Sequence, residues 1–243
     1  MDDFFSRSEA LLGSETMEAL QTKRVILFGV GGVGSWCAEA LVRTGLVHLT
    51  IVDGDTVQPS NVNRQLPATR ETLGRPKVEV LKERLLSINP DAEIEALHRM
   101  YEAQSTMYEE QCTKEAFDFR LSSFDYVIDA IDSVAAKADL IINATRARGV
   151  KIFCSMGAAL RFDPTKVTTG ELMSIQGDAL AKAVRARMKK IGLHPYKKVK
   201  CVYSTEQAQA CATRGSLMQV TTVFGCTLAS LVVEEIGRSG TGW

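Results

Sequence analysis

Residues 24–55 read RVILFGVGGVGSWCAEALVRTGLVHLTIVDGD. The apolar run Val25–Phe28 is typical of a buried strand, and it leads into the glycine turn GVGGVG and then into helix-favouring residues. Glycines let a backbone approach a phosphate closely, and the helix that follows offers free N–H groups to the anion. A second predicted strand, Leu49–Val52, ends at Asp53, where a carboxylate can bind ribose hydroxyls. The stretch therefore predicts a nucleotide site without specifying the nucleotide.

Strand-like and helix-like segments alternate along the rest of the chain. Helices are predicted at 8–20, 77–88, 134–148, 179–191 and 216–237, strands at 94–97, 124–130, 150–154 and 199–203, and an irregular connection at 101–120. This alternation predicts an α/β fold with a Rossmann-like, doubly wound, mostly parallel sheet and helices on both faces, in a single domain spanning 1–243. Ligands of such sheets bind beyond the carboxyl ends of the strands.

The formal net charge is zero, but the charges are unevenly distributed. Residues 179–205 carry eight Lys and Arg and no acid, so a basic region at about 178–200 lies on an otherwise acidic chain. A run of cations is usually a solvated face, but eight without an acid also suit a nucleic-acid backbone. The candidate contacts are Lys182, Arg185, Lys189, Lys197, Lys198 and Lys200.

The six cysteines are scattered with no C-x-x-C pair, which argues against a zinc site or a disulfide framework. Reduced thiols fit a cytoplasmic protein, and the acidic N-terminus does not resemble a signal peptide. The apolar stretch Leu217–Val233 contains enough polar residues to favour a buried helix over a membrane span. Cys201 is a candidate thiol nucleophile, against the commoner case of a free cysteine that is a small buried apolar residue.

The glycine turn and Asp53 alone fit an NAD-dependent dehydrogenase. The motifs that follow favour ATP: a second acid at Asp55, SNVNRQ at 60–65, GRPK at 74–77 and DAID at 129–132. Cleavage of ATP gathers charge on phosphate oxygens, which Arg, Lys and a carboxylate-held Mg²⁺ can stabilise, and hydride transfer has no such need. ATP and Mg²⁺ are therefore the predicted ligands.

In this order and spacing, the motifs GxGGxG, DxDxVxxSNxNRQ, GxPK and DxxD resemble those of the E1-like activating enzymes, the superfamily of ThiF, MoeB and the ubiquitin-activating enzymes. Within it, SRSEALLG, GGVGSW, DAIDS, FDPT and CVYSTE are similar to segments of the tRNA threonylcarbamoyladenosine dehydratases. The resemblance implies an E1-like adenylation fold and a homodimer that uses ATP to cyclise the threonylcarbamoyl side chain of adenosine 37 in tRNA through carboxylate adenylation. It leaves any sulfur-relay or redox protein partner unknown.

The resemblance also implies roles for individual residues. Catalytic roles fall on Arg7, supplied by the neighbouring subunit, and on Arg64, Lys77 and Asp132, of which Asp132 would hold Mg²⁺. The residues implied to bind the nucleotide are Gly29, Gly31, Gly32, Gly34, Asp53, Asp55, Asn61, Asn63, Arg64, Gln65, Lys77, Asp129 and Asp132.

Structural roles compete with several of these assignments. Gly34 could serve only helix packing, Asp55 could be a turn residue, and Asp129 could cap the next helix. Two rival functions also stay open beside the dehydrogenase: an activator of a ubiquitin-like sulfur-carrier protein, and a nucleotide-binding module without catalysis. The first usually carries two C-x-x-C zinc pairs, which this sequence lacks, and the second has no need for the cationic and acidic motifs around the glycine turn.

Overall fold

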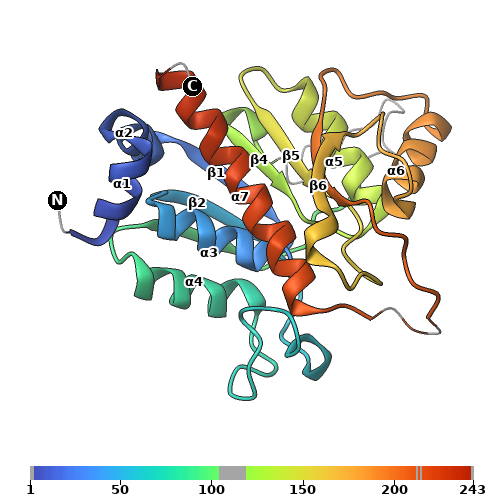
Figure 1. Cartoon of the computed structure of the whole chain (residues 1–243), viewed down its shortest axis with the longest axis horizontal. Coiled ribbons are helices and arrows are strands. Elements are labelled where there is room, and N and C mark those ends of the chain that lie inside the picture. The colour runs from blue at the N-terminus through green and yellow to red at the C-terminus, as the bar shows by residue number, and fades with distance from the viewer. Residues whose placement is uncertain (1–2, 104–118, 212, 214, 242–243) are drawn as a thin grey trace, which may run out of the picture.

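The computed structural model describes residues 3–103, 119–211, 213 and 215–241. The described strands form one seven-stranded sheet in the order β3-β2-β1-β4-β5-β7-β6 (Figure 1). Neighbouring strands are parallel except for β6 and β7, which are antiparallel. The strands are β1 (Arg24–Phe28), β2 (His48–Val52), β3 (Glu93–Leu97), β4 (Tyr126–Asp129), β5 (Lys151–Ser155), β6 (Val167–Glu171) and β7 (Lys200–Ser204).

Helices cover both faces of the sheet, which confirms the predicted doubly wound fold (Figure 1). Those of one face are α2, α3, α4 and α7, and those of the other are α5 and α6. The helices are α1 (Ser6–Leu12), α2 (Ser14–Thr22), α3 (Gly34–Thr44), α4 (Lys77–Ile88), α5 (Val134–Arg146), α6 (Ala179–Lys190) and α7 (Met218–Thr241), with short 3-10 turns at Asp3–Phe5, Pro59–Asn61, Leu121–Ser123 and Pro164–Lys166.

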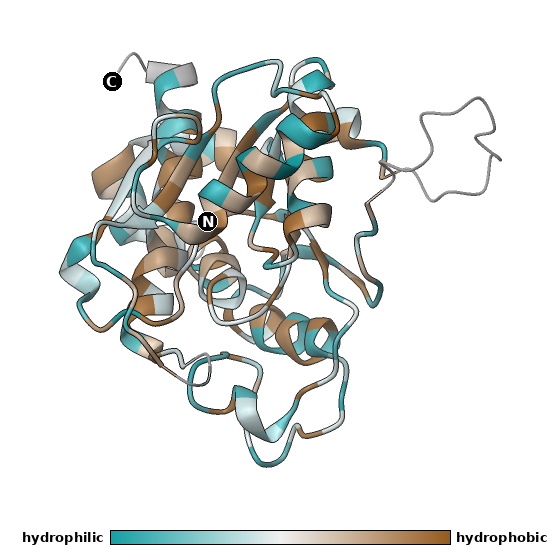
Figure 2. Cartoon of the chain, turned by 90° about the vertical axis from the view of Figure 1, so that its right-hand side faces the viewer, coloured by the Kyte–Doolittle hydropathy of each residue, from teal (hydrophilic) through white to brown (hydrophobic). Residues whose placement is uncertain are grey.

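The central strands are buried on both faces, as an apolar run in a parallel sheet predicts. In β1, Val25 and Leu27 pack toward α3 and α7, whereas Ile26 and Phe28 pack toward α5, and all four are fully buried. Accordingly, many strand residues have the brown colour of hydrophobic residues, while the loops around them are largely hydrophilic (Figure 2). Burying each such side chain contributes about 1.5–3 kcal/mol to the stability of the folded state. Strand β1 therefore stabilises the fold strongly at the point where the glycine turn begins.

Two segments differ from the sequence-based expectation. The helix predicted at 8–20 is two helices, because Gly13 adopts a φ of 79° and interrupts it. Strand β6 is absent from the predicted elements because VTTGE is mostly polar and small, and the strand forms at the sheet edge only through antiparallel pairing with β7. The connection predicted at 101–120 lies mostly outside the described residues.

Helix α7 runs diagonally across α3 (Figure 1). Its segment Met218–Arg238 is long and apolar enough to cross a membrane by length and composition alone. In the structure, however, Phe224, Leu228 and Val232 are fully buried in the core that α3 shares. The two helices come so close at Gly225 that a Cβ there would lie 2.5 Å from the Val33 carbonyl oxygen. These contacts are those of the buried core helix that the sequence predicts.

The glycine turn between β1 and α3 depends on two close backbone approaches. Gly29 has a φ of 87°, and a Cβ on it would lie 2.8 Å from the carbonyl oxygen of Ala130, just beyond β4. A Cβ on Gly34 would lie only 1.8 Å from the carbonyl oxygen of Gly29, inside the contact distance of the two atoms. Gly34 therefore serves helix packing, which lets α3 begin directly over the turn.

This packing predicts that Gly34→Ala destabilises the protein by about 3 kcal/mol or more, because the added methyl forces the turn and α3 apart. Gly31→Ala is the matched control: its Cβ would meet Gln65 Nε2 at an ordinary 3.6 Å, and its unfolding free energy should stay within about 1 kcal/mol of the parent. Urea denaturation followed by circular dichroism measures both. Equal unfolding midpoints for the two variants would contradict the packing role.

Candidate active site

A cavity of about 750 Å³ opens at the carboxyl ends of β1, β2, β4 and β5. Gly29, Gly31 and Gly32 line it, together with the first residues of α6 and the first turn of α7. Strands β1 and β4 are neighbours although the chain passes through β2 and β3 between them, so the cavity lies where the strand order reverses. Open α/β sheets bind ligands at this switch point, where the sequence predicts the nucleotide.

Asp53 connects the glycine turn to the end of β2. Its Oδ2 accepts a hydrogen bond from the Val30 N–H at 2.8 Å, and its Oδ1 accepts one from the Asp55 N–H at 2.9 Å. Each carboxylate oxygen can accept a second hydrogen bond. Asp53 lines the cavity, so it keeps the acceptor capacity that binding ribose hydroxyls requires.

Lys77, the first residue of α4, reaches the cavity because the long loop before it is closed at its neck. The Val57 N–H donates to the Arg75 carbonyl at 2.9 Å, and the Lys77 N–H donates to the Asp55 carbonyl at 3.0 Å. Lys77 is only 4% exposed, and its Nζ lies 2.6 Å from Oδ2 of the half-exposed Asp55. A buried ammonium needs an anionic partner, and a phosphate bound in the cavity could share this role with Asp55.

Arg64 and Gln65 lie on a turn that is anchored to α3. The indole Nε1 of Trp36 donates to the Arg64 carbonyl at 3.1 Å, and Ser35 Oγ accepts from the Leu66 N–H at 3.3 Å. Both Arg64 and Gln65 line the cavity, and the buried Oε1 of Gln65 has no hydrogen-bond partner among the described residues. Sequence reasoning did not assign Ser35 and Trp36 as positioning residues, and the signals for them were their place directly after the glycines and their part in the GGVGSW segment.

Asp132 follows β4 and lines the cavity with an exposed side chain. By contrast, Asp129 is fully buried, with Oδ2 at 2.8 Å from the equally buried Nζ of Lys137. Burial raises the pKa of the Asp129 carboxyl, and the Lys137 ammonium opposes that rise. Oδ1 of Asp129 accepts from the Ile131 N–H at 3.0 Å and so orders the turn that presents Asp132. The prediction that Asp129 itself contacts the nucleotide is therefore wrong.

These residues fit ATP and Mg²⁺. Open glycine backbone, the cations Arg64 and Lys77 and an unpartnered Gln65 oxygen surround one space. Within the described ranges no group of three or more His, Cys, Asp or Glu could hold a metal by itself. Mg²⁺ commonly takes one or two protein carboxylates together with substrate phosphates, which Asp132 beside a triphosphate can provide.

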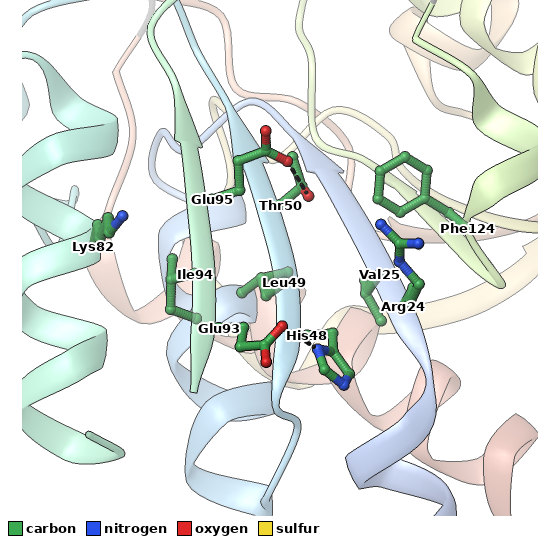
Figure 3. A pocket seen from close by; sticks show the side chains of 10 residues that line it. All are labelled: Arg24, Val25, His48, Leu49, Thr50, Lys82, Glu93, Ile94, Glu95 and Phe124. Atoms are coloured by element: carbon green, nitrogen blue, oxygen red, sulfur yellow. Dashed lines mark hydrogen bonds and ion pairs between the residues drawn. The ribbon is translucent and has the colours of Figure 1, made fainter. Parts of the chain in front are cut away.

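A second hollow, of about 600 Å³, lies toward the amino ends of β1, β2 and β3 (Figure 3). Its polar side chains largely pair with one another: His48 Nδ1 lies 3.0 Å from Glu93 Oε2, and Thr50 Oγ1 donates to Glu95 Oε2 at 3.0 Å. It has no glycine turn and lies away from the switch point. The nucleotide site is therefore assigned to the larger cavity.

The sequence pattern of the ThiF family matches residues 5–241. This chain belongs to the ThiF family. Among its relatives is the tRNA threonylcarbamoyladenosine dehydratase of Bacillus subtilis, 40% identical over 202 residues that cover 83% of this chain and 74% of the relative. The enzyme of that name from Escherichia coli is 35% identical over 207 residues, covering 83% and 73%. Membership of the ThiF family replaces the dehydrogenase interpretation and confirms the resemblance found in the motifs.

Solved structures confirm the E1-like fold of this ThiF-family chain. The E. coli tRNA N6-threonylcarbamoyladenosine dehydratase TcdA, in complex with ATP, superposes with a TM-score of 0.85 at 31% identity and covers 98% of this chain and 95% of its own. The complex of the same enzyme with AMP superposes with a TM-score of 0.86. E. coli MccB with ATP, at 16% identity and a TM-score of 0.61, shares the fold and covers 98% of this chain and 64% of its own.

Besides Asp129, three predicted nucleotide-binding residues of this ThiF-family site lie outside the cavity wall. Asn61 is buried, and its Oδ1 accepts from the Gln58 N–H at 2.9 Å, which closes the 3-10 turn. Asn63 Nδ2 donates to the Ser216 carbonyl at 2.8 Å and so connects the turn to the segment before α7. Gly34 packs against the turn. All three residues therefore support the structure of the site, and the nucleotide contacts implied for them stay predictions.

Arg7 and Cys201 also lie away from the cavity. Cys201 is fully buried in β7 beside Cys154 of β5, with its sulfur 3.6 Å from the Val199 carbonyl oxygen. The predicted nucleophile role is wrong because a substrate cannot reach a thiol enclosed by the core. Arg7 is exposed on α1, which packs against α2, and it is not among the residues that line the cavity of its own chain.

The site predicts that ATP with Mg²⁺, and not NAD, raises the melting temperature. At a concentration 100 times its Kd, a ligand raises the free energy of unfolding by about 2.7 kcal/mol. Lys77→Met should lose most of this stabilisation because it removes the buried ammonium while keeping a long side chain. Lys166→Met, which removes an exposed lysine outside the cavity, is the control and should behave like the parent. Differential scanning fluorimetry measures all three, and stabilisation by NAD alone would overturn the assignment.

Proposed function

We propose that this protein is an ATP-dependent tRNA threonylcarbamoyladenosine dehydratase, which cyclises the N6-threonylcarbamoyl side chain of adenosine 37. The observation that carries the proposal is that the glycine turn, Arg64, Lys77 and Asp132 line one cavity in a chain 40% identical to a dehydratase of that name. ATP and the modified tRNA are then its two substrates. A cytoplasmic location and a single-domain organisation stay predictions.

The first chemical step activates the carboxylate of the tRNA side chain. One carboxylate oxygen attacks the α-phosphorus of ATP, and the bond to the β-phosphate breaks, which gives an acyl-adenylate and pyrophosphate. Charge accumulates on the phosphate oxygens during this step, and Arg64 and Lys77 are cations that line the cavity together with the glycine turn. Loss of one preorganised electrostatic group of this kind typically lowers turnover by about 10²- to 10³-fold.

The second step closes the ring. A nitrogen within the side chain attacks the activated carbonyl carbon, the bond to AMP breaks, and the nitrogen gives up its proton to solvent. A free carboxylate cannot expel oxide, whereas the mixed anhydride readily expels AMP. Closure within one side chain also benefits from proximity, because no second molecule has to be ordered. The oxygen lost in the dehydration therefore leaves on AMP.

Metal binding is the part of the site that rests on Asp132. Asp132 would hold Mg²⁺ together with the nucleotide, and the ion would supply positive charge that neutralises the triphosphate. The buried Asp129–Lys137 pair contributes indirectly, since Asp129 fixes the Ile131 backbone one residue before Asp132. Lys77 is held in place by Asp55 before the nucleotide binds, so its charge needs little reorganisation.

The adenylation route predicts where the carboxylate oxygen goes. With tRNA whose threonylcarbamoyl carboxylate carries ¹⁸O, the AMP released with the cyclic product should contain one ¹⁸O atom, because that oxygen bridges the acyl group and the α-phosphate. Mass spectrometry of AMP, pyrophosphate and inorganic phosphate measures the label. Label in inorganic phosphate instead would indicate transfer of the γ-phosphate and would contradict adenylation.

We further propose that the active enzyme is a homodimer in which Arg7 enters the neighbouring subunit's cavity. Arg7 is exposed on the first helix, at the amino-terminal side of β1, whereas the cavity lies at the carboxyl ends of the strands. A side chain so placed can reach a cavity only on a second copy of the chain. This arrangement would supply the site with a further cation for the phosphates.

Mixing inactive variants tests the shared site. In a heterodimer of Arg7→Ala and Asp132→Ala subunits, one cavity combines an intact Asp132 with an intact partner arginine, so part of the activity should return. The matched control pairs Arg64→Ala with Asp132→Ala, which damages both cavities and should give no recovery. The heterodimers are isolated with two affinity tags. If the Arg7→Ala and Asp132→Ala heterodimer shows no activity, the result would count against a shared active site.

For tRNA binding we propose the exposed cations of the basic region. Lys182 and Lys189 are exposed on α6, and Lys198 is exposed beyond it. Two other candidates have structural contacts: Arg185 Nη1 donates to the Leu172 carbonyl at 2.8 Å, and Lys197 Nζ donates to the Ala147 carbonyl at 3.0 Å. Helix α6 also begins at the cavity, so its exposed face extends outward from the site. Contacts to phosphates set affinity and position without reading sequence.

Lys182→Ala combined with Lys189→Ala should weaken binding of all tRNAs alike and flatten the log–log salt dependence by about 1.5 units, at roughly 0.7–0.9 per lost phosphate contact. The control Arg70→Ala with Lys166→Ala removes the same charge from exposed positions elsewhere. Filter binding over a salt series provides the slopes. An unchanged slope in the α6 variant would place the RNA contacts on another surface.

A further inference from the structure

Beyond the candidate nucleotide-binding residues, the cavity has a second wall whose residues have no role in the proposed reaction steps. This wall consists of residues 155–161, at the end of β5 and in the loop after it, and the start of α6 at Asp178. Arg161 is only 3% exposed although it lines the cavity. Its Nε and Nη1 atoms are buried and have no hydrogen-bond partner among the described residues. Buried guanidinium donors are normally satisfied, so unpartnered ones on a side chain that lines a cavity make that side chain a candidate to bind a ligand.

Asp178 does not satisfy this guanidinium. Its Oδ1 accepts from the Ala181 N–H at 2.8 Å and caps α6, while its Oδ2 accepts from the Gly157 N–H at 3.1 Å. The distance from that Oδ2 to Arg161 Nη2 is 3.9 Å, too long for a hydrogen bond. Asp178 therefore balances the charge of Arg161 and holds it in the wall, but leaves its donors available.

The backbone before Arg161 is held in an unusual conformation. Leu160 has a φ of 62°, in the left-handed region that non-glycine residues rarely adopt. Two hydrogen bonds at 2.9 Å maintain it, from the Leu160 N–H to the Gly215 carbonyl and from the Gln209 N–H to the Leu160 carbonyl. Strain of this kind persists where surrounding structure enforces it, and it is common beside binding sites. Here it places the next side chain, Arg161, in the cavity wall.

We propose that Arg161 binds the carboxylate of the threonylcarbamoyl side chain and orients it for attack on ATP; this inference rests on the proposed function. A guanidinium donates two parallel N–H bonds to a planar carboxylate through one edge, either Nε with Nη2 or Nη1 with Nη2, which fixes its orientation. Asp178 does not hydrogen-bond Nη2, so Nη2 can complete either edge. The phosphates of ATP are the other anions that could occupy the cavity. They already have the glycine turn, Arg64 and Lys77, whereas Arg161 follows β5, one strand beyond the switch point between β1 and β4. After adenylation the remaining carbonyl oxygen still accepts from Arg161.

The test measures the binding preference for the side chain separately from turnover. Two tRNAs, one carrying threonylcarbamoyladenosine at position 37 and one with unmodified adenosine, are titrated in the presence of AMP and followed by fluorescence anisotropy. The parent should bind the modified tRNA more tightly, and Arg161→Gln should lose about 10- to 100-fold of that preference, the scale of a hydrogen-bonded charge. ATP should still raise the melting temperature of the variant. Arg70→Gln, at an exposed position, is the matched control and should keep the preference.

Arg161→Lys keeps the charge but not the two-pronged geometry and should recover only part of the preference. Should neither variant fold, the parent alone decides: modified tRNA whose carboxylate is methyl-esterified should bind about as weakly as unmodified tRNA. Equal binding of acid and ester would overturn the inference. If Arg161→Gln keeps the preference for modified tRNA but is no longer stabilised by ATP, Arg161 contacts a phosphate instead, and this result would also overturn the inference.

Failure of the proposed function gives a different result. If the parent with ATP forms no cyclic nucleoside by mass spectrometry, the dehydratase assignment fails whatever Arg161 binds. If the parent forms it and Arg161→Gln keeps the full preference for modified tRNA, the role of Arg161 alone is refuted.

Discussion

The contact between Gly34 and the carbonyl oxygen of Gly29 is the constraint on which the rest of the site depends. With no side chain at Gly34, α3 begins directly over the end of β1, and its first residues are within reach of the neighbouring loop. Trp36 then holds the Arg64 backbone, while Asp53 holds the turn itself. A wider turn would separate the glycine backbone from both groups. One tight approach therefore positions the nucleotide wall and the cation beside it.

The two carboxylate–lysine pairs near the cavity have different roles because their solvent exposure differs. The pair between Asp129 and Lys137 is fully buried, and no ligand can compete for either charge, so it acts through the backbone it orders. In the pair between Asp55 and Lys77, the lysine is buried but the carboxylate is half exposed. A phosphate can therefore approach this lysine. The same residue types give a structural element in one place and a candidate catalytic group in the other, since desolvation decides which charge stays available.

The cavity combines walls with different origins along the chain. The nucleotide wall comes from residues close to the first glycine turn, whereas the second wall brings together the loop after β5, the cap of α6 and the start of α7. In that second wall, Asp178 caps a helix and faces Arg161 at the same time. Because the helix cap fixes the carboxylate of Asp178, the Arg161 guanidinium that faces it is held in the wall, and a guanidinium held in this way suits recognition of a planar anion.

The sequence by itself determined the alternating fold, the glycine turn, the family, and the placing of Asp53, Lys77 and Asp132 beside that turn. These depend on local patterns: apolar periodicity, strand–turn–helix order and short motif spacing. Those patterns did not reveal that Asp129 and Cys201 are enclosed or that Asn61 closes a turn, since burial depends on what packs over a residue. Arg161 gave no local signal at all. Only the tertiary structure places it, through the strained Leu160 and a carboxylate from α6, because its role arises from contacts between segments that are distant in sequence.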